Sequence, residues 1–367
     1  MENLEANFGL QILSNLNVNE TCIFSPLSIL MSLSMIQLGA RGATMENMRQ
    51  KLFRNQNDKV IMDHFKPFLK LIDYEEGNVK TEIFNRFYLP AGSKMNKTFV
   101  DQVYDTYNTD FKGANFSDTR VAQKMNEDIT KSLKREYTKR SISARSVANS
   151  AGILINTMYF QAQWKNPFTK YGPSFFYKSA NHYEKIQFLK DESRKVLYNH
   201  DEAFQVVGFE YQDDDYRFVI FLPFTRFGLK AAIDQMTIER FNYLVNTMYE
   251  DTVTIKLPIF IIEKQLDIKK ALKKQGLRDV FNENSNLSGF GPKVKITSAL
   301  HQSIVKVYPA GSVFGFHSKG NETYGSYLMG SVIYRKINLP PFKVHVDHPF
   351  MFAVMRGSTP LYMGIYN

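Results

Sequence analysis

The hydrophobic positions of this chain follow helical spacing through most of its first half and strand-like alternation through much of its second half. Apolar residues recurring with a period of about 3.6 predict helices, whereas short alternating or unbroken apolar runs predict strands. We expect helices over residues 7–16, 26–38, 44–52, 59–72, 97–107, 121–139, 227–235, 238–249 and 267–276, and strands over 79–89, 151–160, 206–211, 216–223, 252–263, 303–308 and 342–352. With no internal repeat or linker, the pattern predicts one mixed α+β domain, residues 1–367.

One predicted helix is apolar on every face. It begins at Pro26, which a first helical turn tolerates, and Ser25 can cap it. A helix without a polar face must be buried, so its internal serines, Ser28 among them, need hydrogen-bond partners. The same holds for Asn156, which interrupts the apolar run at 151–160 that is typical of a central strand covered on both faces.

A long segment without either periodicity follows the strand at 303–308. It begins at Pro309 and is rich in Gly, Ser, Asn and Tyr until the alternation resumes at Phe342. A structureless segment of this length inside a compact protein is usually a functional binding loop or a disordered insert. We therefore expect the rest of the chain to be a scaffold that presents it.

The composition bounds the classes of partner. The 367 residues are 44% hydrophobic, with a formal net charge of +10, so the chain can bury a large core and favours acidic partners. Only the stretch 131–145 is densely basic. It is interpreted either as a solvated helix face with the loop after it or as a polyanion site formed by Lys131, Lys134, Arg135, Lys139 and Arg140.

Cys22 is the only cysteine, which excludes an intrachain disulfide and a thiolate-rich metal site. No metal-ligand spacing and no nucleophile elbow is present, so we expect no metal, no cofactor and no catalytic residues. The N-terminus lacks a signal-peptide layout and no stretch is long enough to span a membrane, which predicts a leaderless or cytoplasmic monomer without membrane or specific nucleic-acid partners. Five glycosylation sequons leave an extracellular location open: Asn19, Asn96, Asn115, Asn286 and Asn321.

Several motifs, in this order along the chain, resemble those of the serpin family. They begin with Ser25-Pro-x-Ser28 and continue through Gly39-Ala-x-Gly42-x-Thr44, Asn156-x-x-Tyr159-Phe, Trp164-x-x-x-Phe168, Leu257-Pro-x-Phe260, Leu272-x-x-x-Gly276, Leu287-Ser-Gly289, His301, Asp347-His-Pro-Phe350 and Met363-Gly364. The resemblance covers almost the whole chain. It implies a serpin fold, with three β-sheets surrounded by about eight or nine helices and an exposed reactive-centre loop at about 309–340.

The resemblance also implies a mechanism. In inhibitory serpins a serine or cysteine protease cleaves the loop, whose first part then inserts into the main sheet and drags the protease across the molecule. By position, Ser28, Asn156 and His301 match the polar cluster beneath the sheet, and Trp164 matches the aromatic residue where insertion begins. The simpler alternatives are that His301 is a hydrogen-bonded core histidine without a role in insertion, and that Trp164 is an ordinary core residue. Partners are expected to be a protease or another protein bound through the loop.

The start of the loop departs from the family pattern. We call residues 309–316 the hinge; its notable residues are Pro309, Gly311, Ser312, Phe314 and Phe316. Inhibitors carry small residues here, whereas Pro309 lacks a ladder donor and the two phenylalanines are bulky. The sequence thus predicts a serpin that does not trap proteases and is instead a substrate or binder; the alternatives are a working inhibitor of a trypsin-like or cysteine protease and a polyanion-binding or carrier serpin.

The cleavage site is expected at Arg335 and Lys336. Counting back from Phe350 leads there, but counting forward from Pro309 leads near Gly325, so the loop is longer than the family pattern by about ten residues. The alternative is that both charges merely end a short strand at 331–334. Arg335 is the only arginine of the loop, which favours a trypsin-like enzyme.

Overall fold

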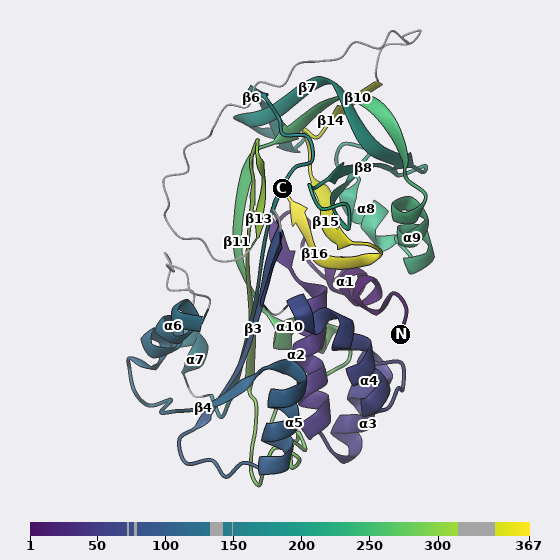
Figure 1. The fold of residues 1–367 in the computed structure, drawn as a ribbon. Helices are drawn as coiled ribbons and strands as arrows, with labels where there is room; N and C mark the ends of the chain where they lie inside the picture. Colours follow the sequence, from purple (N-terminus) through teal and green to yellow (C-terminus); the bar gives the residue numbers. More distant parts are fainter. Residues whose placement is uncertain (72, 77–78, 133–141, 149, 315–341) are drawn as a thin grey trace.

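The computed structural model describes residues 1–71, 73–76, 79–132, 142–148, 150–314 and 342–367. Two sheets dominate the part that is described (Figure 1). A seven-stranded sheet runs along the length of the molecule, and a nine-stranded sheet lies at one end with the C-terminal strands in it.

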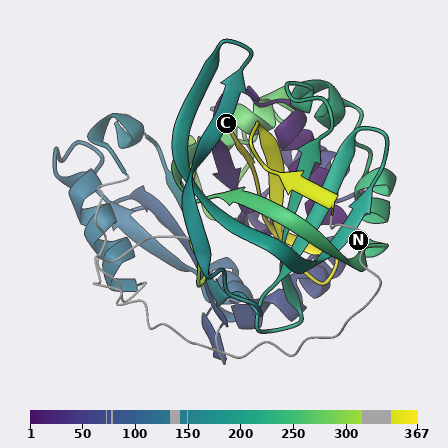
Figure 2. The same cartoon turned by 90° about the horizontal axis from the view of Figure 1, so that it is seen from above.

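Helices surround the two sheets (Figure 1). Their bounds are α1 Leu4–Ser14, α2 Pro26–Gly39, α3 Gly42–Leu52, α4 Asp58–Phe65, α5 Lys97–Tyr107, α6 Val121–Ser132, α7 Ala144–Val147, α8 Leu229–Asp234, α9 Ile238–Asn246 and α10 Ile268–Lys274, with a 3-10 helix at Lys66–Leu71. In Figures 1 and 2, α6 and α7 lie on one side of β3 (Val79–Pro90) and α2 lies on the other.

The seven-stranded sheet contains the segments that matter most for the site. Its order is β11-β12-β13-β5-β3-β2, with β4 beside β3; the bounds not yet given are β2 Asp73–Glu76, β4 Asp110–Ala114, β5 Ile153–Gln163, β11 Phe260–Asp267, β12 Ser298–Val307 and β13 Gly311–Phe314. β13 lies near the start of the aperiodic segment that begins at Pro309. The expectation that this segment is structureless is therefore wrong for the four residues Gly311–Phe314.

The nine-stranded sheet has the order β1-β16-β15-β9-β8-β7-β10-β14, with β6 beside β7. Its strands are β1 Cys22–Phe24, β6 Lys170–Ser179, β7 His182–His200, β8 Phe204–Glu210, β9 Tyr216–Pro223, β10 Tyr249–Pro258, β14 Phe342–His345, β15 Phe350–Arg356 and β16 Thr359–Tyr366. β7 pairs with β6 and β10 over most of its length and with β8 only at its end. This long strand joins two of the three sheets expected for the fold into one.

Two strand assignments from the sequence are wrong. The single strand expected over 252–263 is two strands in different sheets, since β10 ends at Pro258 and β11 begins at Phe260. The strand expected over 342–352 is likewise two strands, β14 and β15, which do not pair with each other: β14 pairs in parallel with β10, while β15 pairs with β9 and β16. The helix expected over 59–72 is also interrupted, and the tighter 3-10 turn begins next to Pro67, whose missing N–H cannot continue an α-helix.

The core surrounds α2, all of whose residues are buried, as its uniform hydrophobicity predicted. Ser25 caps the helix by accepting a hydrogen bond from the backbone N–H of Ser28 at 3.1 Å. On the opposite face of the sheet, Met125 and Ile129 of α6 pack against Ile153 and Ile155 of β5. The sheet is thus enclosed on both faces where β5 and β12 run side by side.

Within the described ranges, no helix is both long and apolar enough to cross a membrane. The same residues contain no group of three or more His, Cys, Asp or Glu side chains that could hold a metal ion.

Candidate functional site

The hinge enters the sheet through a tight turn. β12 ends at Val307, and the chain reverses over Pro309 and Ala310 so that Tyr308 donates from its backbone N–H to the carbonyl of Gly311 at 3.0 Å. Pro309 therefore lies in the turn, outside the strand ladder. The penalty expected from its missing donor does not arise there, since fixed φ and no N–H are features that a turn tolerates.

β13 is wedged between β12 and β5. It is antiparallel to both: Ser312 pairs with Val307 on one side and with Ala162 on the other. Further down, β12 pairs directly with β5 in parallel, from Ser298 to Gln302. The sheet is open at one end by the width of a strand and closed below it, and the first four strand residues of the hinge fill the opening.

Gly311 is required at this entry. A Cβ built on Gly311 would lie 2.2 Å from the carbonyl oxygen of Ala162 and 2.8 Å from the Cα of Gln163, both of which are backbone atoms of β5. The approach of the two backbones leaves no space for any side chain. The glycine thus fixes where the hinge begins to pair with β5.

Trp164 holds the turn in place. Its indole Nε1 donates to the carbonyl of Tyr308 at 2.9 Å, and its backbone N–H donates to the carbonyl of Ala310 at 3.0 Å. The ring is fully buried and stacks on Tyr211, with centroids 4.7 Å apart and planes 5° from parallel. Phe168 adds a third contact by donating its backbone N–H to the carbonyl of Pro309 at 2.9 Å.

Ser312 and Tyr211 bring two hydroxyls into the interior beside this turn. Both residues are buried, with exposed fractions of 1% and 0%. Burial raises the pKa of Tyr211, and the nearby hydroxyl of Ser312 opposes part of that shift. The phenol thus stays neutral at any physiological pH.

A buried polar cluster lies where β5 and β12 meet below β13. Asn156 accepts from the Ser28 hydroxyl at 3.0 Å and donates to the backbone carbonyl of Ser28 at 3.1 Å. It also donates to Oδ1 of Asn85 on β3 at 2.6 Å, and Ser32 donates to the same oxygen at 2.7 Å. The cluster thereby joins α2, β3 and β5 through satisfied polar groups in an otherwise apolar core.

His301 extends this cluster to β12. Its Nε2 accepts from the backbone N–H of Ser25 at 2.9 Å, so the ring proton must sit on Nδ1, which donates to Oδ1 of Asn156. The Ser303 hydroxyl lies 2.7 Å from Nε2. Burial lowers the pKa of His301 to about 3, and the imidazole is consequently neutral in the folded state across the physiological range.

An ion-pair network attaches α6 to the outer face of the sheet. Asp128 of α6 accepts from Arg86 at 2.6 Å and from the Tyr88 hydroxyl at 2.6 Å, and Lys112 is a third partner. Burial alone would raise the pKa of Asp128, but the hydrogen bonds from Lys112, Tyr88 and Arg86 lower it overall. These contacts hold α6 against β3 and β4.

The structure brings residues 309–314 of the predicted hinge, Trp164 and the Ser28–Asn156–His301 cluster to one part of one sheet. Their roles in loop insertion stay predictions. Sequence reasoning did not single out Asn85, Ser25, Ser303 or Tyr211 for the site, although Asn85 interrupts the apolar run of β3 as Asn156 interrupts that of β5. That shared pattern was the available signal.

Several predicted residues lie outside the described residues or at their edge. Phe316, Arg335, Lys336, Lys134, Arg135, Lys139 and Arg140 are not among those the structure describes. Lys131, at the end of α6, is exposed.

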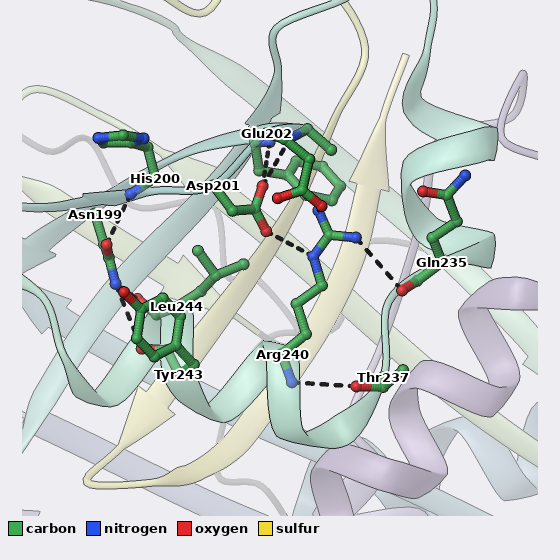
Figure 3. A network of polar contacts seen from close by, with 11 residues as sticks. Asn199, His200, Asp201, Glu202, Gln235, Thr237, Arg240, Tyr243 and Leu244 are labelled. Carbon is green, nitrogen blue, oxygen red and sulfur yellow. Dashed lines mark hydrogen bonds and ion pairs between the residues drawn. The ribbon is translucent and has the colours of Figure 1, made fainter.

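A second polar network, drawn in Figure 3, is structural. Arg240 of α9 donates from Nε to Asp201 at 2.6 Å and pairs with Glu202 at 3.0 Å. Asn199 donates to the carbonyl of Leu244 at 3.2 Å near the C-terminus of the same helix. These hydrogen bonds and ion pairs hold α9 against the turn between β7 and β8.

Comparison with known proteins agrees with this architecture. The family model described as Serpin (serine protease inhibitor) matches residues 3–367. Neuroserpin of Rattus norvegicus is 24% identical over 94% of this chain and 85% of its own length, and serine protease inhibitor 42Dd of Drosophila melanogaster is 24% identical over 96% and 93%.

Solved structures match the fold over nearly its full extent. Serpin48 of the insect Tenebrio molitor superposes with a TM-score of 0.84 at 22% identity, covering 99% of this chain and 96% of that one. Thyroxine-binding globulin in complex with thyroxine superposes with a TM-score of 0.81 at 18% identity, covering 99% and 97%.

The chain has the serpin fold, a mixed α/β architecture of two large sheets and surrounding helices. It belongs to the serpin family, whose members are protease inhibitors and not enzymes. Serpins bind target proteases, so the loop between β13 and β14 is the segment to consider for partners.

Proposed function

We propose that this serpin does not trap proteases by complete loop insertion, and that it acts through its reactive-centre loop as a protease substrate or a binder of another protein. The observation that carries the proposal is the register of β13. Residue 314 pairs with Phe160 and Val305, both of which have fully buried side chains.

Continuing this register would put the next loop residues against fully buried positions of the sheet. Each further residue moves one step along β5 and β12, so residue 316 would pair with Met158 and Ser303, which are both 0% exposed. In that register, residue 318 would pair with Asn156 and His301. Insertion would thus have to place Phe316 beside filled positions and then break the bond between Asn156 and His301.

The cost of placing Phe316 and of breaking the bond between Asn156 and His301 raises the barrier to loop insertion and so lowers its rate. Overpacking a core costs about 1–3 kcal/mol per site, and a barrier raised by ~3 kcal/mol slows a step more than a hundredfold. Trapping requires insertion to finish before the acyl-enzyme hydrolyses. If loop insertion is slowed to this extent, the acyl-enzyme hydrolyses first, and the protease leaves a cleaved serpin behind.

The length of the loop supports the same conclusion. About ten additional residues, each spanning ~3.3 Å when extended, allow slack of some tens of ångströms between the inserted strand and a tethered protease. A protease held on such a tether keeps an undistorted active site.

One observation favours an inhibitor as the second candidate. β13 is already seated, with Pro309 in the turn and Gly311 fitted against β5, so the entry step carries no remaining cost. If the core also accommodates Phe314 and Phe316, insertion can proceed from this start, and a trypsin-like or cysteine protease would be trapped.

Incubation with trypsin distinguishes the two functions. We expect the first cut at Arg335-Lys336, no SDS-stable complex and full residual trypsin activity, with the C-terminal peptide released only on denaturation. The variant Arg335→Gln/Lys336→Gln serves as the control, because it should resist that first cut. Stoichiometric loss of trypsin activity together with an SDS-stable band would overturn the proposal, and first cleavage elsewhere, identified by mass spectrometry, would remove the site assignment.

A further inference from the structure

A pocket of about 350 Å³ lies where the segment after α1 and the strand β1 meet β11 and α10. We call it the α1–α10 pocket. Its lining includes four half-buried apolar side chains, one or more from each side: Leu16, Cys22, Leu266 and Ala271. The volume is at the lower end of the range for small-molecule sites in proteins. The described residues that line it include none of the hinge or of the buried polar cluster.

The local structure places a cation beside each apolar wall. Lys264 and Leu266 are two residues apart on β11, so both side chains lie on the same face of that strand. On α10, Lys274 is a surface neighbour of both Lys270 and Ala271, which are four and three residues away. The pocket thus has an apolar lining bordered by ammonium groups.

The charged groups of the lining leave one positive charge in excess. Three ammonium groups stand against two carboxylates, which gives a formal charge of +1: Lys264, Lys270 and Lys274 against Glu20 and Asp267. Both carboxylates already accept hydrogen bonds. Glu20 accepts from the side chain of Asn17 at 3.1 Å, and Asp267 accepts from the backbone N–H of Lys270 at 3.0 Å.

Two of the three cations are left for a ligand. Lys274 donates to the backbone carbonyl of Asn15 at 2.6 Å. The side chains of Lys264 and Lys270 are exposed, and within the described ranges neither makes a hydrogen bond or an ion pair. Lys264 also acts on the wall of the pocket: burial raises the pKa of Cys22 to about 12 although this ammonium group opposes the shift, so the thiol is a neutral, apolar surface.

We propose that the α1–α10 pocket binds one aliphatic monocarboxylate of about eight to ten carbons, with its carboxylate beside Lys264 and Lys270 and its tail against the apolar lining. A lining charge of +1 complements a single anionic group, whereas further negative charges on the ligand would face Glu20 and Asp267. The tail displaces water from the half-buried apolar side chains, which supplies most of the affinity. The proposal is independent of loop insertion, so failure of either proposal leaves the other intact.

Calorimetric titration of the full chain with sodium decanoate tests the proposal. We expect saturable binding of one molecule with a Kd below about 1 mM. Octanoate has two fewer methylenes and should bind up to about 15-fold more weakly, since each buried methylene changes the Kd by about fourfold. A Kd for decanoate equal to that for octanoate, or no saturable binding, would overturn the ligand class.

The variant Lys264→Gln/Lys270→Gln tests the place of the carboxylate. Its Kd for decanoate should rise about 5- to 20-fold, while its Kd for the uncharged octanol should stay within about twofold of that of the parent chain. The matched control Lys66→Gln/Lys70→Gln removes two charges from exposed positions on the 3-10 helix and should leave the Kd for decanoate within about twofold. Equal weakening of decanoate binding in both variants would overturn the assignment of the two lysines.

Labelling with N-ethylmaleimide tests the site itself, because Cys22 is the only cysteine of the chain. Decanoate at about ten times its Kd should slow labelling of the parent chain roughly tenfold. At the same concentration the Lys264→Gln/Lys270→Gln variant should be slowed less than about threefold, since its pocket is only partly occupied. Calorimetric binding of decanoate without protection of Cys22 would place the ligand elsewhere and would overturn the proposal.

Discussion

At the scale of single residues, the protonation state of His301 decides whether the hydrogen bonds that join β12 to Ser25 and to β5 can form. His301 is the only member of the buried cluster that lies on β12 and contacts both Ser25 and Asn156 through its ring. Its neutral form fits these contacts, since Nε2 accepts while Nδ1 donates. A second proton on the ring would leave the Ser25 N–H without an acceptor and would place a charge in the core.

The protonation of His301 predicts a pH dependence of stability. The imidazole is protonated below about pH 6.5 in the unfolded chain, but only near pH 3 in the folded one. Between these values the unfolded state binds more protons, so the contribution of His301 is present above pH 6.5 and is lost as the pH falls toward 3. From pH 7 to pH 5 we expect this residue to account for a loss of about 2 kcal/mol in unfolding free energy.

Urea unfolding of the His301→Gln variant at both pH values measures this contribution. The variant cannot titrate at this position and should lose about 2 kcal/mol less than the parent chain over that interval. Its control is His182→Gln, because the His182 side chain is 62% exposed, and it should retain the parent pH dependence. Identical slopes for the parent chain and His301→Gln would refute the assignment.

At the scale of elements, β13 is the strand on which the functional question depends. It shows that the first hinge residues fit between β5 and β12, with Gly311 allowing the close backbone approach. If the register of β13 continued, the next bulky residue, Phe316, would be set against Met158 and Ser303. Removing that bulk is the direct way to ask whether it limits insertion.

We expect Phe314→Ala/Phe316→Ala to convert the chain from a substrate toward an inhibitor. Relieving about 1–3 kcal/mol at position 316, the first bulky position after β13, should speed insertion by roughly 5- to 150-fold, so an SDS-stable complex with trypsin should appear. Phe224→Ala/Phe227→Ala, which removes two exposed aromatic rings far from the hinge in sequence, should form no complex. Absence of a complex with the hinge variant would show that bulk is not the limiting feature.

How much could be predicted from the sequence differs between elements. α2 and α5 matched the predicted ranges closely because strong hydrophobic patterns and a Pro26 or Asn108 boundary define them. β13 could not be predicted, because its four residues carry no period and its pairing depends on two distant strands. The split between β10 and β11 was equally hidden, since the apolar alternation continues while the chain passes from one sheet to the other.

The candidate site shows the same limit. Ser28, Asn156 and His301 were identifiable as buried polar groups or by resemblance, and the structure joins them. The part of Tyr211 in holding Trp164, and that of Ser25 in fixing the His301 tautomer, depend on contacts between residues far apart in sequence. Such contacts follow from the packed sheet and have no local signature.

At the scale of the whole molecule, the two sheets and the loop form one system in which cleavage frees the hinge segment. If insertion goes to completion, the seven-stranded sheet gains a full central strand and the stability of the fold rises. If insertion stops after β13, cleavage changes almost nothing in the packed part of the chain. The difference between these outcomes is large compared with the effect of any single contact.

The thermal stability of the cleaved chain therefore tests the central claim most directly. The loop would be cut by limited trypsin digestion, and the melting temperatures of intact and cleaved protein would be compared under identical conditions. With insertion arrested after β13, the two temperatures should agree to within a few degrees, since ~1 kcal/mol shifts the melting temperature of a protein of this size by only about 2–4 °C or less. A rise of some tens of degrees on cleavage would mean that the loop inserts fully, and would contradict the account.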